Sequence, residues 1–192
     1  MAERLLFAER AGLERRILCV DDAAVDDLGR RHLAYGGFSV HACLIGGDLT
    51  DEAARVFGQL GPVGTVLEAG YGEATTLSVL GAKLAGRPVL GGFDISWSRV
   101  KLGGQFAAGR GMSPTLFCAD LFRIPLADRS VDVVYTSHSI EPNGGREREA
   151  IGELARVARK WLVLLEPAHD LAKEEARLRM EGHGYVRDLA TT

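Results

Sequence analysis

The sequence predicts an α/β fold in which a mostly parallel sheet carries helices on both faces, and three observations support this prediction. From residue 65 onward, short apolar runs alternate with helix-like segments, a pattern typical of strand–helix–strand units. The runs contain few polar residues, as is expected of strands that helices cover on both faces. The length of 192 residues fits one domain of ordinary size. We therefore expect one compact unit built around a single sheet.

Composition narrows the classes of function. Hydrophobic residues make up 46% of the chain and charged residues 26%, as in a globular domain. The 23 basic and 26 acidic residues give a net charge of −3 without a basic block, which argues against general binding to nucleic acid or to a membrane surface. No apolar run reaches about 18 residues, and the charged start is unlike a secretory signal. We therefore expect a cytoplasmic protein whose partner is a small molecule or another protein.

The three cysteines are far apart and form no CxxC pair, and the five histidines are scattered along the chain. These spacings are unlike those of metal ligands, so we expect no metal site. Cys118 falls in a predicted buried strand, where a thiol is inert.

The first 64 residues have a different pattern from the rest, and we expect a helical N-terminal preface or lid there. The predicted helices of this preface are Ala2–Leu18, Ala23–Leu33 and Leu49–Leu60. A tight connector, Gly61-Pro62-Val63-Gly64, joins it to the remainder. We therefore divide the chain into the preface, residues 1–64, and a ligand-binding domain, residues 65–192.

Five strands are expected in the second part, connected by helices. The strands are Thr65–Ala69, Val89–Asp94, Thr115–Ala119, Val131–Thr136 and Trp161–Glu166. The helices are Ala74–Leu84, Ser98–Ala108 and Arg146–Arg159. In the last helix, apolar residues from Ile151 to Ala158 recur at spacings of three and four, so this stripe should pack on the sheet.

A glycine turn follows the first of these strands. Gly70 and Gly72 allow the backbone to approach a ligand closely, and the amides at the start of the next helix favour an anionic group such as a carboxylate or phosphate. The third small position is Ala74 instead of glycine, which departs from the strict dinucleotide fingerprint. The turn predicts a ligand site without identifying the ligand.

An acidic residue lies at the end of each of the next two predicted strands or directly after it. Asp94 lies 26 residues beyond Glu68, where nucleoside-binding α/β proteins use a carboxylate to accept hydrogen bonds from both ribose hydroxyls. The alternative role for Asp94 is to cap the following helix. Asp120 follows the third strand and begins the segment D-x-x-x-x-P-x-x-D-x-S-x-D-x-V, which runs to Val134.

With this segment, Thr65–Pro167 resembles the class I S-adenosylmethionine-dependent methyltransferases, in particular the methyltransferase type 11-like group. Four motifs occur in the same order and at the same spacing over roughly half of the chain. The resemblance implies a Rossmann-like fold, S-adenosylmethionine as cofactor and methyl transfer as activity.

The resemblance also implies roles for individual residues. Those expected to bind the cofactor are Glu68, Gly70, Tyr71, Gly72, Asp94, Ile95, Asp120, Leu121 and Ser137. The glycine turn would shape the methionine end, with Glu68 near the amino group through water or backbone. Asp94 would hold the ribose hydroxyls, and Ile95 would pack against the adenine. Asp120 would accept from the exocyclic amine of the adenine, the Leu121 amide would meet a ring nitrogen, and Ser137 would border the sulfonium.

A sulfonium makes its methyl group electrophilic, so the protein must mainly align a nucleophile, exclude water and accept a proton. His138 is the candidate general base, because an imidazole with an ordinary pKa of about 6.5 accepts a proton at neutral pH. A structural hydrogen bond is the alternative role for His138, and Glu141 is the alternative base or acceptor contact. Tyr71 could face the cation with its ring, with core packing as its alternative.

The leading functional hypothesis is methyl transfer from S-adenosylmethionine to a small-molecule or glycan-like acceptor. One alternative is a non-catalytic subunit that binds S-adenosylmethionine or a partner protein. The other is an NAD(P)-binding oxidoreductase, which is disfavoured because the turn lacks the strict glycine pattern and the Asp120 segment has no counterpart there.

The C-terminal part is short, because only 25 residues follow Pro167. Methyltransferases of this class usually continue with a helix and a β-hairpin, and here we expect a charged helix over Asp170–Met180 with the hairpin missing. The sheet should then stop at five strands, with Trp161–Glu166 as an open apolar edge. We expect either that the chain is a piece of a longer protein or that a second copy covers this edge in a homodimer.

Overall fold

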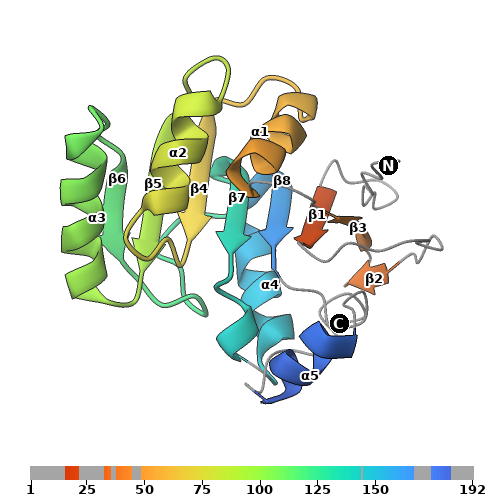
Figure 1. The fold of residues 1–192 in the computed structure, drawn as a ribbon. Coiled ribbons are helices and arrows are strands. Elements are labelled where there is room, and N and C mark those ends of the chain that lie inside the picture. The colour runs from red at the N-terminus through yellow and green to blue at the C-terminus, as the bar shows by residue number, and fades with distance from the viewer. Residues whose placement is uncertain are drawn as a thin grey trace.

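The computed structural model describes residues 16–21, 33–35, 38–44, 49–143, 145–166 and 174–182, and these form one sheet flanked by helices (Figure 1). The strands are β1 (Arg16–Asp21), β2 (Leu33–Tyr35), β3 (Phe38–Leu44), β4 (Thr65–Ala69), β5 (Val89–Asp94), β6 (Thr115–Cys118), β7 (Val131–Ser137) and β8 (Ala158–Leu165). The helices are α1 (Leu49–Gln59), α2 (Thr75–Lys83), α3 (Trp97–Gly109), α4 (Glu147–Val157), α5 (Glu174–Gly182) and the short 3₁₀ helix η1 (Glu141–Asn143).

The five strands predicted after residue 64 are confirmed as β4 to β8, and they run parallel to one another. Their order in the sheet is β6-β5-β4-β7-β8. Of these five strands, β4 comes first in the sequence and lies in the middle. The chain then runs outward through β5 to β6 and crosses back to β7. In open parallel sheets, ligands bind at the carboxyl ends of the strands where the order reverses, which here is between β4 and β7.

Apolar side chains alternate between the two faces of the sheet. On one face, Val66 and Tyr135 pack with residues of α1 and α2, among them Phe57 and Leu77. On the other face, residues such as Leu67 and Val134 pack against α4. Figure 1 shows α1 and α2 over the first face and α4 behind the second. Both faces are covered, which explains why the strands are apolar throughout.

The helical prediction for the N-terminal part is only partly confirmed. Leu49–Leu60 is a helix, α1, but Arg16–Leu18 lies in strand β1 and Leu33 begins strand β2. The remaining parts of the two predicted helices, residues 2–15 and 23–32, lie outside the described residues. The physical reason is pairing: β1 lies between two strands that satisfy its backbone groups, and such tertiary pairing overrides a weak local helix pattern.

The prediction of an open edge at Trp161–Glu166 is wrong. Strand β8 pairs with β7 on one side and with β1 on the other, in a parallel register that joins Arg16 to Trp161 and Val20 to Leu165. Beyond β1, the described residues continue the sheet with β3 and an antiparallel β2. The chain thus covers the edge itself, which removes the reason for a homodimer through β8. The division at residue 64 stays a prediction, although the sheet takes strands from both sides of it.

Other boundaries differ by a few residues. Helix α4 ends at Val157 and β8 begins at Ala158, so the predicted helix to Arg159 was too long. The predicted C-terminal helix is described as α5, and residues 170–173 of its predicted range lie outside the described residues. No helix in the described part of the chain is long and apolar enough to cross a bilayer, and a cytoplasmic location stays a prediction.

Candidate active site

The glycine turn at the end of β4 has the strained backbone that the sequence predicts. Gly70 and Gly72 have φ angles of 70° and 58°, in the left-handed region that favours glycine. The Gly70 amide donates to the Phe93 carbonyl oxygen at the end of β5, at 2.8 Å. A Cβ atom on Gly70 would lie 2.4 Å from the Ser139 Cβ atom, which is too close for any other residue type. The turn therefore touches both neighbouring strand ends.

Asp94 lies at the end of β5 and is 7% exposed. Its Oδ2 atom accepts from the Gly72 amide at 3.0 Å, and its Oδ1 atom accepts from the Ser96 amide at 2.8 Å. The carboxylate thus fixes the glycine turn relative to the start of α3. Asp94 therefore acts much as a helix cap and also lies where the sequence predicts a ligand site. Each carboxylate oxygen has further lone-pair capacity, so two ribose hydroxyls could still donate to it.

The predicted adenine side is formed by the ends of β5 and β6. The Ala119 amide donates to the Asp94 carbonyl oxygen at 3.1 Å, which brings these strand ends together. Ile95 is 72% exposed, although its side chain is large and apolar. Asp120 is exposed as well, and its Oδ1 atom accepts from the Phe122 amide at 2.9 Å. A flat ring between Ile95 and Asp120 would cover the apolar side chain and meet a hydrogen-bond acceptor.

Glu68 is buried in the core. It is 1% exposed, and its Oε2 atom accepts from the Tyr135 hydroxyl at 2.6 Å. Burial raises the pKa of Glu68 from its ordinary value of 4.5 to about 8, although the Tyr135 hydroxyl opposes this shift. Glu68 therefore joins β4 to β7 through a buried hydrogen bond.

Tyr71 is also a core residue, at 3% exposure. Its ring is closely approached by Gly92 and Gly103, where a Cβ atom would come within 2.7 Å of ring carbons at either position. The Tyr71 hydroxyl is buried, and no described residue forms a hydrogen bond with it. This placement supports the core-packing alternative for Tyr71.

The two predicted catalytic residues meet on the loop after β7. Ser137 is the last residue of β7, and His138 follows with a φ of 53°, which is uncommon for a residue with a side chain. The His138 amide donates to the Leu165 carbonyl oxygen at 3.0 Å. The His138 Nδ1 atom lies 3.4 Å from Glu141 Oε2, and the histidine side chain is 44% exposed. The ring is thus reachable from solvent and oriented by a carboxylate.

Sequence reasoning missed Glu166, which follows β8. It is 3% exposed, and its carboxylate accepts from the amides of Ser139, Ile140 and Glu141 at 2.9, 3.2 and 3.3 Å. Burial raises the pKa of Glu166, and the three amides oppose that shift. The signal was present in the sequence, because Glu166 is an acidic residue that ends an apolar strand, as Asp94 is.

Sequence reasoning also missed a pair on α4 that holds the loop after Asp120. Glu153 Oε1 accepts from the Ile124 amide at 2.8 Å, and Arg156 donates to the carbonyl oxygens of Ile124 and Leu126 at 3.0 and 2.8 Å. The Arg156 guanidinium lowers the pKa of Glu153. The E-x-x-R spacing on a helix could have indicated this pair.

The expectation that Cys118 is buried is wrong, because this residue is exposed. Among the described strands, β6 pairs with β5 alone and forms an edge of the sheet, which leaves the thiol accessible. The Sγ atom lies 3.1 Å from the Ile95 carbonyl oxygen.

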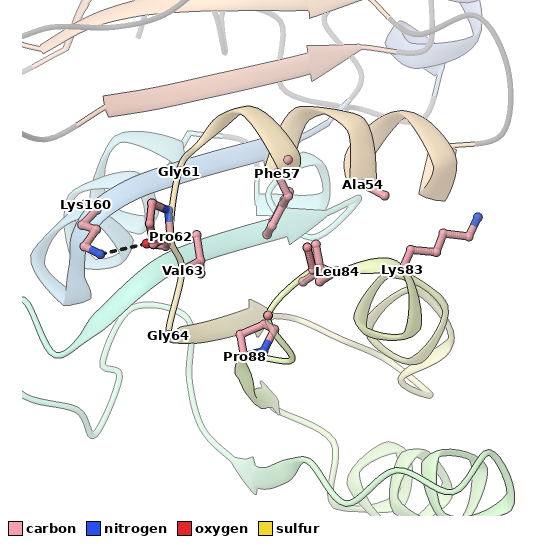
Figure 2. Close-up of a pocket in the computed structure, with 13 residues that line it drawn as sticks. Ala54, Phe57, Gly61, Pro62, Val63, Gly64, Lys83, Leu84, Pro88 and Lys160 are labelled. Atoms are coloured by element: carbon pink, nitrogen blue, oxygen red, sulfur yellow. Dashed lines mark hydrogen bonds between the residues drawn. The ribbon is translucent and has the colours of Figure 1, made fainter.

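A cavity of about 620 Å³ lies elsewhere, at the amino ends of β4 and β5. Figure 2 shows Phe57, Val63, Leu84 and Pro88 around this cavity. Lys160 Nζ donates a hydrogen bond to the Pro62 carbonyl oxygen at its rim. Because ligands of open parallel sheets bind at the carboxyl ends, this cavity is not the candidate active site. No cluster of metal-ligating side chains is found among the described residues.

The comparisons agree with this geometry. Residues 67–163 match the family model described as a methyltransferase domain, which is half of the chain, and the chain therefore belongs to this family. A search of curated proteins gives no match. Membership of this family makes the chain an S-adenosylmethionine-dependent methyltransferase.

Several solved structures share the fold at low sequence identity. A SAM-dependent methyltransferase from Aquifex aeolicus is 19% identical, with a TM-score of 0.54 over 70% of this chain and 78% of that one. The YcgJ protein from Bacillus subtilis is 18% identical, with a TM-score of 0.50 over 59% and 50%. The PH0226 protein from Pyrococcus horikoshii is 20% identical, with a TM-score of 0.50 over 56% and 50%. The chain thus spans about half the length of the last two.

The site fits S-adenosylmethionine. Gly70 leaves no room for a side chain at the turn, and Asp94 keeps acceptor capacity toward a ribose. The carboxylates of Asp94 and Glu141 lie at the same ends of the sheet and favour a cationic sulfonium over a pyrophosphate. When bound, the cofactor supplies an electrophilic methyl group, and the protein supplies orientation and proton transfer.

Proposed function

We propose that this methyltransferase transfers a methyl group to a small-molecule or glycan-like acceptor, with His138 as general base and Glu141 as the residue that orients it. The observation that carries this proposal is the pairing of His138 and Glu141 at 3.4 Å on a loop that touches the glycine turn. Ser139 in this loop donates from its hydroxyl to the Ala69 carbonyl oxygen at 2.9 Å. The candidate base is therefore tied to the turn that would hold the methionine end of the cofactor.

The chemistry follows from the tautomer that Glu141 favours. A carboxylate at Nδ1 stabilises the proton on that nitrogen, which places the lone pair of the neutral imidazole on Nε2. An acceptor hydroxyl or amine could then lose its proton to Nε2 as the methyl group is transferred. If Glu141 is the base instead, removal of His138 would leave the rate nearly unchanged.

The proposal assigns the cofactor contacts as the sequence predicts. Asp94 binds the ribose hydroxyls, Asp120 and the Leu121 amide bind the adenine, and Ile95 packs on its ring. The turn at Gly70 and Gly72 receives the methionine carboxylate. Ser137 borders the sulfonium. Their common support is position, because all lie at or just beyond the carboxyl ends of β4 to β7.

Two measurements test the proposal. In the first, calorimetry compares binding of S-adenosylhomocysteine to the parent and to Asp94→Ala. Loss of an acceptor for two hydroxyls costs about 1.5–3 kcal/mol, which is roughly ten-fold or more in affinity. Asp51→Ala, which removes an exposed carboxylate on α1, is the control and should bind as the parent does. Equal affinity of the parent and Asp94→Ala would show that Asp94 does not hold the ribose.

In the second measurement, the protein is incubated with S-adenosylmethionine and fractionated metabolite extracts that include free glycans. Mass spectrometry then searches for a product that gains one CH₂ unit, together with an equal amount of S-adenosylhomocysteine. A product that forms only with a macromolecular acceptor would contradict the small-molecule assignment.

A further inference from the structure

We propose that Glu166 is a positioning residue for methyl transfer, which holds the loop carrying His138 and Glu141 against the glycine turn. This inference rests on the proposed function for the identity of the base. It assigns a task to a buried carboxylate that the proposed chemistry does not itself use. Glu166 does not act on the substrate, because its oxygens are buried and occupied by backbone amides.

The first support is the number and arrangement of the amides. Three consecutive residues, Ser139 to Glu141, direct their backbone N–H groups at one carboxylate. Both oxygens of the carboxyl group take part, because Oε1 accepts from two of the amides and Oε2 from the third. Consecutive amides that converge on one carboxyl group fix the path of the backbone, not only the place of one residue. The loop conformation after β7 therefore depends on Glu166.

The second support comes from the opposite side of the loop. The Ser139 hydroxyl donates to the Ala69 carbonyl oxygen, and Gly70 leaves space for the Ser139 side chain. Ser139 thus lies between Glu166, which binds its amide, and the turn, which receives its side chain. The loop is held from two sides, by β8 and by β4.

The position of His138 follows from this arrangement. Its φ of 53° is a backbone conformation that a residue with a side chain adopts at a cost of about 1 kcal/mol or more. Such a conformation persists only where its neighbours enforce it. The Leu165 carbonyl oxygen fixes the His138 amide, and Glu166 fixes the three residues that follow. Without Glu166, His138 and Glu141 would lose their common orientation.

The test is hydrogen exchange and amide NMR of Glu166→Gln in the full chain. Glutamine keeps the size and one acceptor oxygen, but its NH₂ group faces an N–H donor, so at least one amide loses its acceptor. We expect exchange at Ser139–Glu141 to become about ten-fold faster or more, because fewer bonds oppose local opening. The amide proton resonances of these residues should move upfield, a signature that general loss of stability would not give.

Glu153→Gln is the matched control. It also replaces a carboxylate that accepts a backbone amide, but that amide belongs to Ile124 in another loop. Its exchange at Ser139–Glu141 should equal that of the parent. If Glu166→Gln does not fold, Glu166→Asp replaces it, since its shorter side chain cannot reach all three amides, and it should raise hydrogen exchange at Ser139–Glu141 several-fold.

The results separate this inference from the proposed function. Unchanged exchange and resonances at Ser139–Glu141 in a folded Glu166→Gln variant would overturn the positioning role. The same holds if Glu166→Asp, used in its place, leaves exchange at Ser139–Glu141 unchanged. Failure of the parent to bind S-adenosylhomocysteine would instead overturn the proposed function, whatever the exchange data show.

Discussion

His138 combines a left-handed backbone, an exposed ring and a carboxylate at its Nδ1 atom. The sequence indicates this residue by its place at the end of a buried strand. Its partnership with Glu141 became visible when the structure showed the 3₁₀ turn that returns Glu141 to the ring.

Replacing His138 by alanine should separate binding from turnover. We expect S-adenosylhomocysteine affinity to stay within about two-fold of the parent, because none of the proposed cofactor contacts is removed. The rate of methyl transfer should fall by roughly 10²-fold or more if the imidazole is the base. Calorimetry and the product assay measure the two quantities. Equal loss of both would mean that His138 shapes the cofactor site.

The raised pKa of Glu68 predicts that the stability of the folded chain depends on pH. Its pKa in the folded chain is about 8, against 4.5 ordinarily, so between these values the folded chain retains a proton that the unfolded chain releases. The free energy of unfolding therefore falls as pH rises through this window. Each pKa unit corresponds to about 1.4 kcal/mol, so the fall is on the order of a few kcal/mol.

Urea unfolding at several pH values checks this prediction with Glu68→Gln, which stays neutral and still accepts from Tyr135. The free energy of unfolding of the variant should equal that of the parent near pH 4.5 and exceed it near pH 8. Glu149→Gln, which removes an exposed carboxylate, serves as the control for the change in charge. Parallel pH profiles for Glu68→Gln and the parent would contradict the buried, protonated assignment.

At the scale of elements, helix α3 packs through a glycine against the turn that follows β4. A Cβ atom at Gly103 would lie 2.7 Å from the Tyr71 Cε2 atom and 3.2 Å from the Ala74 Cβ atom. The next residue, Gly104, has no atom within 4 Å of such a Cβ. Two adjacent glycines of one helix thus have opposite environments, and this contrast cannot be inferred from the pair Gly-Gly in the sequence.

Alanine at these two positions should have opposite effects. Gly103→Ala forces Tyr71 or the helix to shift, which costs about 1–3 kcal/mol. Gly104→Ala gains helix propensity and should stabilise the chain by about 0.5–1 kcal/mol. Thermal unfolding of the two variants measures both. Similar melting temperatures would show that α3 does not pack this closely on Tyr71.

At the scale of the whole molecule, the N-terminal part completes the sheet that the family motifs begin. Strand β1 lies between β3 and β8, so each of its two sides faces a ladder of backbone hydrogen bonds. Figure 1 shows these strands continuing the sheet beyond β8. The edge that would otherwise favour association with another chain is paired within the molecule.

A proline in β1 tests this arrangement. Leu18→Pro removes a backbone donor from a central strand, and we expect a loss of about 3 kcal/mol or more in unfolding free energy. Hydrogen exchange should also become faster in β8. Leu18→Val keeps the donor and favours a strand, so it should behave as the parent does. A proline variant as stable as the parent would show that β1 does not pair with β8.

The sequence by itself determined the parts that depend on local pattern. Five apolar runs gave the parallel strands, the glycines gave the left-handed turn, and the acidic strand ends gave the residues grouped at one edge of the sheet. Each of these features can be predicted because apolar runs, positive φ angles and positions at strand ends depend on residues near one another in the chain.

The tertiary structure decided the rest. The role of Arg16–Leu18 depended on an available edge at β8, which lies more than a hundred residues away in the sequence. Glu68 and Asp94 have the same chemistry and similar positions, yet one is buried against Tyr135 and the other binds the amides of the turn. Burial and partners, which sequence position does not specify, set the pKa of a carboxyl group and hence what it can do.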